Sequence, residues 1–238
     1  MNHDLTLCVT VFGSHPKWVG MLEVWLKYYL KSGCRMPVVV ITDHEAVIRS
    51  AITPPGVHVM RFDPTRIPGI RRDGQAFDTQ GSLICQAIRV MGRCVVMDTD
   101  ALIFKDPTRE FAKLPVEARM GMAADAGGRS IDTTHGTLSE CNGGVLYFGD
   151  DTVEGRESIV ADYARTFNEA RAAYEANPLL EQVAWSVLWH RLKAIGQGCD
   201  IPRCLNWSHF WPMNEDVLIR HEHGGCKWHR VEGGRYVG

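Results

Sequence analysis

The chain alternates between short apolar runs, which predict buried strands, and longer segments whose apolar residues recur every three or four positions, which predict helices. In the first hundred residues the apolar runs predict strands over 5–13, 36–43, 57–62 and 94–100. Helical spacing runs from Trp18 to Leu30, with an end at Gly33, and again over 76–91. This rhythm predicts an α/β fold with a mostly parallel central sheet and helices on both faces.

The second half of the chain is less regular. It predicts strands over 121–125, 143–148 and 217–221, and helices over 157–176 and 178–194. From Gly196 onward the chain is rich in Gly, His and Trp. Ordering such a tail costs backbone entropy, so we expect it to fold over something. No internal repeat or linker divides the chain, and a single domain over 1–238 is expected.

Composition narrows the class of protein only slightly. The 238 residues are 45% hydrophobic and 23% charged, and the net charge of -2 gives no general attraction to nucleic acid or anionic membranes. No apolar stretch approaches the ~18 residues of a membrane span, and the start does not resemble a signal peptide. We therefore expect a soluble, cytoplasmic protein without a membrane span. Its eight cysteines are expected to be reduced and mostly buried.

The stretch CVVMDTDALIFKDP, residues 94–107, places Asp98 and Asp100 directly after an apolar run. In an extended chain, side chains two residues apart point to the same face, so the two carboxylates should converge while Thr99 points away. Neighbouring carboxylates repel unless they share a proton or bind a cation. Mg²⁺ and Mn²⁺ prefer oxygen ligands and often bridge carboxylates to phosphates, so the pattern favours a metal site for a diphosphate. Alternatively, one aspartate caps the next turn and the other is solvated.

Cysteines and histidines near the C-terminus offer a different metal site. A tetrahedral zinc site could draw on Cys199, Cys204, His209, His221, His223, Cys226 and His229. No Cys-x-x-Cys pair occurs among them, so the spacing does not specify a zinc site.

Four segments, taken in order, resemble the GT-A fold glycosyltransferases that use nucleotide-sugar donors. The segment VVMDTDALIFKDP resembles their Asp-x-Asp segment, CNGGVLYF (141–148) their Asn-small-Gly-Val strand, and EQVAWSVL (181–188) their Asp-Gln segment. HEHGGCKW (221–228) matches a His-x-x-Gly-x-x-Lys-(Pro)-Trp motif typical of glycosyltransferase family eight, which includes glycogenin and bacterial lipopolysaccharide galactosyltransferases. The chain is similar to a distant member of that family.

The resemblance implies that Asp98, Asp100 and His221 coordinate Mn²⁺ (or Mg²⁺), which holds the diphosphate of a UDP-sugar donor. His223 is a rival ligand, because His-x-His also places two rings on one face of an extended segment. Lys227 would face the diphosphate as a point charge, and Gly224 would let the backbone approach it.

The resemblance also assigns residues to the rest of the donor. Those implied for the nucleoside and the metal-bound diphosphate are Thr10, Val11, Phe12, Gly13, Asp43 and Thr99. Those implied for the sugar and acceptor side are Asn142, Gly143, Gly144 and Asp125. Gln182 would stabilise positive charge on the sugar ring and Glu181 would bind its hydroxyls. Alternatively, Glu181 and Gln182 only cap the first turn of their helix.

Three departures separate the chain from the family pattern. The stretch TQGSLICQAI, before the Asp-x-Asp strand, lacks the usual basic residue, for which Gln80, Ser82, Gln86, Arg71 or Arg72 could substitute. No proline stands between Lys227 and Trp228, and Val183 occupies the place of an acidic residue.

The expected function is therefore metal-dependent sugar transfer from a UDP-sugar, with retention of anomeric configuration, to an unidentified acceptor. The acceptor could be a saccharide, a lipid-linked glycan, a protein or a hydroxylated nucleobase in DNA. Residues 1–107 would form the nucleotide-binding half and 108–238 the sugar and acceptor half. The alternatives are a nucleotidyltransferase of similar fold and a zinc-stabilised binding module. The oligomeric state stays open.

Overall fold

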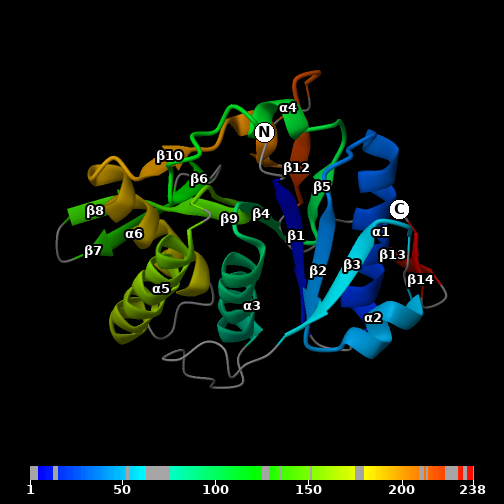
Figure 1. Ribbon diagram of the computed structural model, residues 1–238, viewed down its shortest axis with the longest axis horizontal. Helices are drawn as coiled ribbons and strands as arrows, with labels where there is room; N and C mark the ends of the chain where they lie inside the picture. The colour runs from blue at the N-terminus through cyan, green and yellow to red at the C-terminus, as the bar shows by residue number, and fades with distance from the viewer. Residues whose placement is uncertain are drawn as a thin grey trace.

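The computed structural model describes most of the chain (Figure 1). The described residues are 5–12, 16–51, 54–62, 76–124, 129–133, 136–150, 152–174, 180–208, 212, 214–222, 230–232 and 235–237.

A seven-stranded sheet forms the centre, in the order β10-β6-β9-β4-β1-β2-β3. Its strands are β1 (Thr6–Val11), β2 (Val38–Thr42), β3 (Val57–Arg61), β4 (Cys94–Met97), β6 (Met120–Ala124), β9 (Cys141–Phe148) and β10 (Gly198–Asp200). Strands β4, β1, β2 and β3 are mutually parallel, whereas β9 runs antiparallel to both β4 and β6. The expected mostly parallel sheet is confirmed, and the carboxyl ends of β4, β1 and β2 meet at one edge.

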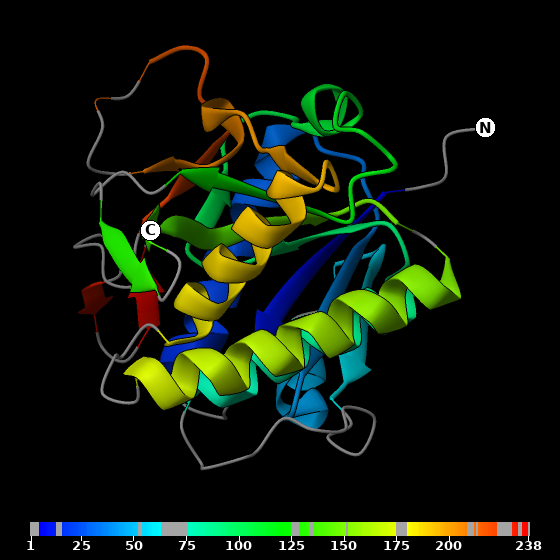
Figure 2. The ribbon, with the colours of Figure 1, turned by 90° about the vertical axis from the view of Figure 1, so that its left-hand side faces the viewer.

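Helices cover both faces of this sheet (Figure 1). One face packs against α3 (Ala76–Met91), α5 (Val153–Tyr174) and α6 (Leu180–Ala194). The other packs against α1 (Pro16–Ser32) and α2 (Glu45–Ala51). Side chains along β1 alternate between the two faces of the sheet. Cys8 packs in the core beneath α3, α5 and α6, and Leu7 and Val9 pack in the core beneath α1 and α2. The helices α5 and α6, which lie at an angle to each other in Figure 2, are in contact through the stacked rings of Tyr163 and Trp185, whose centroids are 3.7 Å apart.

A second sheet of three short strands lies beside the Asp-x-Asp segment. It contains β11 (Trp207–Ser208), β12 (Ile219–His221) and β5 (Ala101–Ile103), with β12 in the middle, parallel to β11 and antiparallel to β5. The remaining short elements are α4 (Thr108–Phe111), the 3₁₀ helix η2 (Arg203–Leu205), and the strand pairs β7 (Ser130–Thr133) with β8 (Gly136–Ser139) and β13 (Arg230–Glu232) with β14 (Arg235–Val237).

One sequence expectation is wrong in its geometry. The strand predicted to run through Asp100 ends at Met97, and residues 98–100 form a turn in which the Ala101 N–H donates to Asp98 O at 3.0 Å. The two carboxylates therefore converge because the chain turns there, not because side chains alternate along a strand.

Two further expectations concern the whole chain. No helix in the described ranges is long and apolar enough to cross a membrane. Seven of the eight cysteines lie in described parts of the chain, and all seven are free thiols; five are buried and two, Cys199 and Cys204, are half-buried.

Candidate active site

Two segments from distant parts of the chain bring Asp98, Asp100 and His221 together. The turn after β4 supplies the aspartates, and β5 leaves this turn to pair with β12, with Ala101 opposite His221. The Glu222 N–H donates to Asp100 O at 2.9 Å and continues this pairing. The register of β12 against β5 therefore sets the imidazole beside the two carboxylates.

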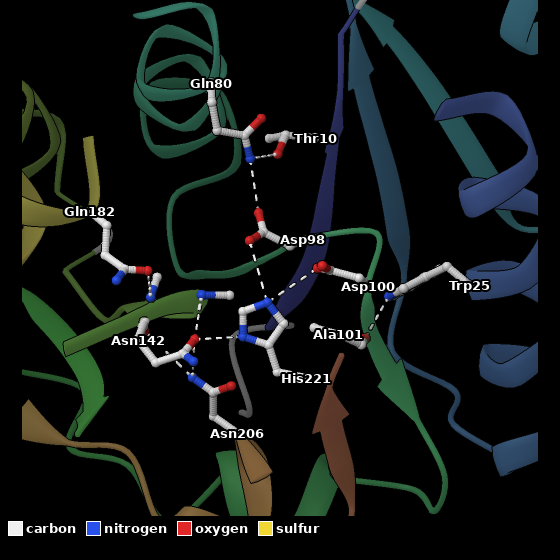
Figure 3. A network of polar contacts seen from close by, with 12 residues as sticks. Thr10, Trp25, Gln80, Asp98, Asp100, Ala101, Asn142, Gln182, Asn206 and His221 are labelled. Atoms are coloured by element: carbon white, nitrogen blue, oxygen red, sulfur yellow. Dashed lines mark hydrogen bonds and ion pairs between the residues drawn. The ribbon is translucent and has the colours of Figure 1, made fainter. Parts of the chain in front are cut away.

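The three side chains form a compact group of metal-ligand type (Figure 3). His221 Nε2 lies 3.2 Å from Asp100 Oδ1 and 3.9 Å from Asp98 Oδ2, and the three potential ligand atoms lie within 4.8 Å of one another. Two carboxylates and one imidazole suit a divalent ion such as Mn²⁺. His221 and Asp100 are buried, but the Asp98 side chain is 36% exposed, so the group opens to solvent on that side.

The charges of the group perturb one another. Partial burial raises the pKa of Asp98, and the charge of Asp100 raises it further, while His221 and Gln80 oppose the rise. Burial alone would lower the pKa of His221, but the charge and hydrogen bond of Asp100, together with Asp98, raise it. A cation between these groups would relieve the carboxylate repulsion, so the residues present fit a divalent metal.

Gln80 links the group to the end of the first strand. Its Nε2 donates to Thr10 Oγ1 at 2.6 Å and to Asp98 Oδ1 at 3.0 Å (Figure 3). Gln80 lies on α3, where the family pattern has a basic residue, and is one of the substitutes considered from the sequence. An amide here orients Asp98 without adding positive charge next to the two carboxylates.

The other expected donor residues lie along the same edge. Thr10 and Val11 are buried, and Phe12 packs on Trp18 with ring centroids 5.5 Å apart. Thr99 is buried in the turn between the aspartates. Beyond β2 there is a cavity of about 450 Å³, lined by Asp43, His44, Glu45, Ala46, Arg49 and Arg61.

The start of α6 contributes two polar side chains. Gln182 Oε1 accepts from the Gly143 N–H at 3.2 Å, and its Nε2 donates to the buried carboxylate of Glu140 at 2.5 Å. Both ends of the amide are therefore fixed. Glu181 is buried, and burial followed by the charge of Asp98 raises its pKa to about 8. A side chain that served only as a helix cap would be expected at the surface.

Several expected residues lie outside the described part of the chain. They are Gly13, Asp125, Gly224 and Lys227, together with the rival ligand His223 and the arginines Arg71 and Arg72. Of the proposed zinc ligands, His209, Cys226 and His229 also lie outside it. Within the described residues, His221 groups with aspartates and neither Cys199 nor Cys204 joins a metal-ligand group.

Sequence reasoning missed two polar residues of this region, Glu140 and Asn206. Glu140 holds Gln182 across 42 positions of sequence, and Asn206 Nδ2 donates to Asn142 Oδ1 at 3.1 Å. Glu140 directly precedes the CNGGVLYF segment, which is a weak signal for it. Asn206 carries no such signal, because its partner Asn142 is 64 positions away in the sequence.

The fold, with an aspartate-bearing turn at the carboxyl edge of the sheet, is that of the GT-A glycosyltransferases. Neither the protein-family models nor the curated proteins give a match to the chain. The likeness is carried by solved structures at low sequence identity, as expected of a distant relative.

The galactosyltransferase LgtC, solved with donor and acceptor sugar analogues, matches 95% of this chain and 90% of its own, with a TM-score of 0.62 and 14% identity. The glycosyltransferase GlyE of Streptococcus pneumoniae TIGR4 matches 92% of this chain, which spans 54% of GlyE, with a TM-score of 0.62 and 14% identity. Mouse xyloside xylosyltransferase 1 matches 93% of this chain and 98% of its own, with a TM-score of 0.59 and 11% identity. LgtC is a member of glycosyltransferase family eight, the family that the motifs resemble.

Proposed function

We propose that the protein is a metal-dependent glycosyltransferase that moves a sugar from a UDP-sugar to an acceptor. The observation that carries this proposal is the group formed by Asp98, Asp100 and His221 at the carboxyl edge of a GT-A sheet. In α/β folds of this kind ligands bind at that edge. The comparison with LgtC supports the proposal, since that protein was solved with donor and acceptor sugar analogues.

Asp98, Asp100 and His221 would hold the metal, Mn²⁺ or Mg²⁺. When bound, the ion supplies positive charge that neutralises a diphosphate and stabilises it as a leaving group. Asp98 is the exposed member of the group, so the phosphates would approach from its side. Lys227 and Gly224 are proposed to close on the same phosphates through the HEHGGCKW motif.

The nucleoside is proposed to bind along the ends of β1 and β2. Thr10, Val11, Phe12 and Gly13 would hold the base and ribose, and the cavity beside Asp43 offers room for part of them. Thr99 would contribute from the aspartate turn. In this assignment residues 1–107 bind the nucleotide and residues 108–238 shape the sugar and acceptor side.

The sugar is proposed to lie between the aspartate turn and the start of α6, against Asn142, Gly143 and Gly144. Gln182 would stabilise positive charge that develops on the ring, and Glu181 and Asp125 would bind hydroxyls. One solved form of LgtC is an active-site mutant with glutamine replaced by glutamate, so an active site of this fold also contains a glutamine. Retention of configuration is part of the proposal, and the acceptor is a saccharide, a lipid-linked glycan, a protein or a hydroxylated nucleobase.

Hydrolysis of a panel of UDP-sugars, with and without Mn²⁺, tests this function. We expect Mn²⁺-dependent release of UDP from one or a few donors and its loss in Asp100→Ala. Asp200→Ala is a matched control, because the Asp200 side chain is 68% exposed on β10 and pairs with Lys193. Release of UMP in place of UDP would instead indicate nucleotidyl transfer. Equal hydrolysis in the wild type and Asp100→Ala would contradict the metal-site assignment.

A further inference from the structure

The ring nitrogen of His221 that faces away from the aspartates is held by a buried amide. His221 Nδ1 lies 2.7 Å from Asn142 Oδ1 (Figure 3). The same oxygen accepts from the Gly144 N–H at 2.8 Å and from Asn206 Nδ2 at 3.1 Å. Asn142 and Asn206 are each 2% exposed, so water does not compete for these contacts.

This arrangement fixes the proton on the imidazole. A backbone N–H can only donate, so the atom of Asn142 that faces Gly144 must be the amide oxygen. An amide oxygen can only accept, so His221 Nδ1 must carry a proton in order to contact it. When the ring is neutral, the lone pair is therefore on Nε2, the nitrogen that faces Asp98 and Asp100.

Asn206 reaches Asn142 from the segment between η2 and β11 and has one possible orientation. If its amide were reversed, its own oxygen would face Asn142 Oδ1 and the two acceptors would repel. In the observed orientation Asn206 Oδ1 has no hydrogen-bond partner among the described residues. A buried acceptor without a partner lowers the stability of the folded protein by about 1–3 kcal/mol. Packing alone would therefore not favour an asparagine at position 206.

We propose that Asn142 and Asn206 are positioning residues that lock His221 in the Nδ1–H tautomer and present Nε2 to a divalent cation. The inference rests on the metal-binding role under Proposed function and gives Asn142 a task besides lining the sugar. Asn142 acts as the acceptor and Asn206 as a donor that holds that acceptor in place. Partners behind a ligand histidine commonly affect metal affinity in this way.

Exchanging each asparagine for aspartate tests the two roles in opposite directions. In Asn142→Asp a carboxylate oxygen can still accept from His221, Gly144 and Asn206, so we expect Mn²⁺ affinity to be kept or increased. In Asn206→Asp the donor becomes an acceptor that faces Asn142 Oδ1. We expect Mn²⁺ affinity to fall about 10- to 100-fold, the usual range for loss of a partner behind a ligand. Asn142→Leu, which removes the acceptor, should fall by a similar factor.

Electron paramagnetic resonance of free Mn²⁺, titrated with the full-length protein, measures these affinities, and His221→Ala gives the level without the imidazole. Equal Mn²⁺ affinity in the wild type, Asn142→Leu and Asn206→Asp would overturn the proposal. A similar loss of Mn²⁺ affinity in Asn142→Asp and Asn206→Asp would also overturn the proposal. Such a result is expected if both asparagines only fill space, whereas the proposed acceptor and donor roles predict different results for the two variants.

Nitrogen-15 NMR of metal-free protein, at a pH where the His221 ring is neutral, separates this inference from the proposed function. We expect a proton on Nδ1 in the wild type and in Asn142→Asp, and a mixture of tautomers in Asn206→Asp. If wild-type protein bound no Mn²⁺ but showed this pattern, the proposed metal site would be wrong, and the proposal that Asn142 and Asn206 hold His221 in the Nδ1–H tautomer would still be supported. A proton on Nε2 in the wild type would overturn the proposed tautomer of His221. This test does not depend on whether Asn142→Leu folds.

Discussion

At the scale of single residues, the two glycines of the CNGGVLYF segment have different neighbours. A methyl group added at Gly144 would lie 2.2 Å from His221 Cε1 and 2.3 Å from Nδ1, far inside contact distance. A methyl group added at Gly143 would lie 3.4 Å from Gln182 Oε1, at the edge of ordinary contact. The position of the His221 ring therefore leaves no room for a side chain at residue 144, whereas residue 143 has room for a methyl group.

We expect Gly144→Ala to displace His221 and to weaken Mn²⁺ binding at least about 10-fold, the lower end of the cost of disturbing a ligand's support. Gly143→Ala is the matched control and should keep Mn²⁺ affinity near the wild-type value. Calorimetric titration with Mn²⁺, with thermal unfolding to confirm the fold, makes the comparison. If both alanine variants bind Mn²⁺ as the wild type does, the His221 ring is not confined by Gly144.

Residue types and spacing could identify the proposed metal ligands, but not the residues that hold those side chains in place. The Asp-x-Asp pattern and the His-x-x-Gly-x-x-Lys motif pointed to Asp98, Asp100 and His221, and the structure brings these three together. Glu140 and Asn206 could not be found in this way. Each acts through a contact 42 or 64 positions away in sequence, which only the packed fold creates.

At the scale of elements, α1 supports the strand that follows the aspartate turn. Trp25 is fully buried, and its Nε1 donates to Ala101 O at 3.0 Å. Ala101 is the residue of β5 that pairs with His221. The indole therefore holds the start of β5, and through it the pairing that positions the histidine.

Trp25→Phe should lower the free energy of unfolding by about 1–3 kcal/mol, because it leaves a buried carbonyl without this donor. Trp18→Phe, at a half-buried position of the same helix, should cost less. Urea denaturation of the metal-free proteins measures both variants. A smaller loss for Trp25→Phe than for Trp18→Phe would show that the indole contact does not hold β5.

Hydrophobic patterning predicted the long elements well and the turn poorly. The expected strands over 36–43 and 57–62 and the helix over 76–91 appear as β2, β3 and α3 with small differences at their ends. The strand expected over 94–100 ends three residues early, because Asp98 is followed by a turn closed by its own carbonyl. Short elements such as β5 and β11 depend on pairing with distant strands, so local periodicity does not reveal them.

At the scale of the whole molecule, the buried carboxyl of Glu181 makes stability depend on pH. Its pKa is raised from an ordinary value of 4.5 to about 8. Between these values the unfolded chain releases the proton while the folded protein keeps it, so this group favours folding less as pH rises. Its contribution is complete below pH 4.5 and is lost as pH passes about 8.

Glu181→Gln replaces the carboxyl with a group that does not titrate. We expect the variant to gain stability relative to the wild type as pH increases from 4.5 to 8, because only the wild type must then take up a proton when it folds. Chemical denaturation of both metal-free proteins across this range measures the difference in free energy of unfolding. A difference that does not change with pH would show that Glu181 titrates as an ordinary surface carboxylate.

The architecture of the whole molecule was predictable because the hydrophobic pattern and the order of the motifs indicated the same fold. Strand and helix patterns indicated a mostly parallel sheet with helices on both faces, and the order of four motifs resembled GT-A enzymes. The protein has that sheet, and the solved structures it resembles are glycosyltransferases at 11–14% identity. At such identity the likeness shows the fold, and it names neither a sugar nor an acceptor for this chain.

Asp98, Asp100 and His221 are proposed to form a metal site that holds a nucleoside diphosphate. Calorimetric titration of UDP into the full-length protein, with Mn²⁺ and with the metal removed by chelation, tests it most directly. We expect UDP binding that requires Mn²⁺ and is lost in Asp100→Ala and His221→Ala, while Asp200→Ala binds UDP as the wild type does. UDP binding of equal affinity with and without Mn²⁺, or unchanged in those two variants, would contradict it.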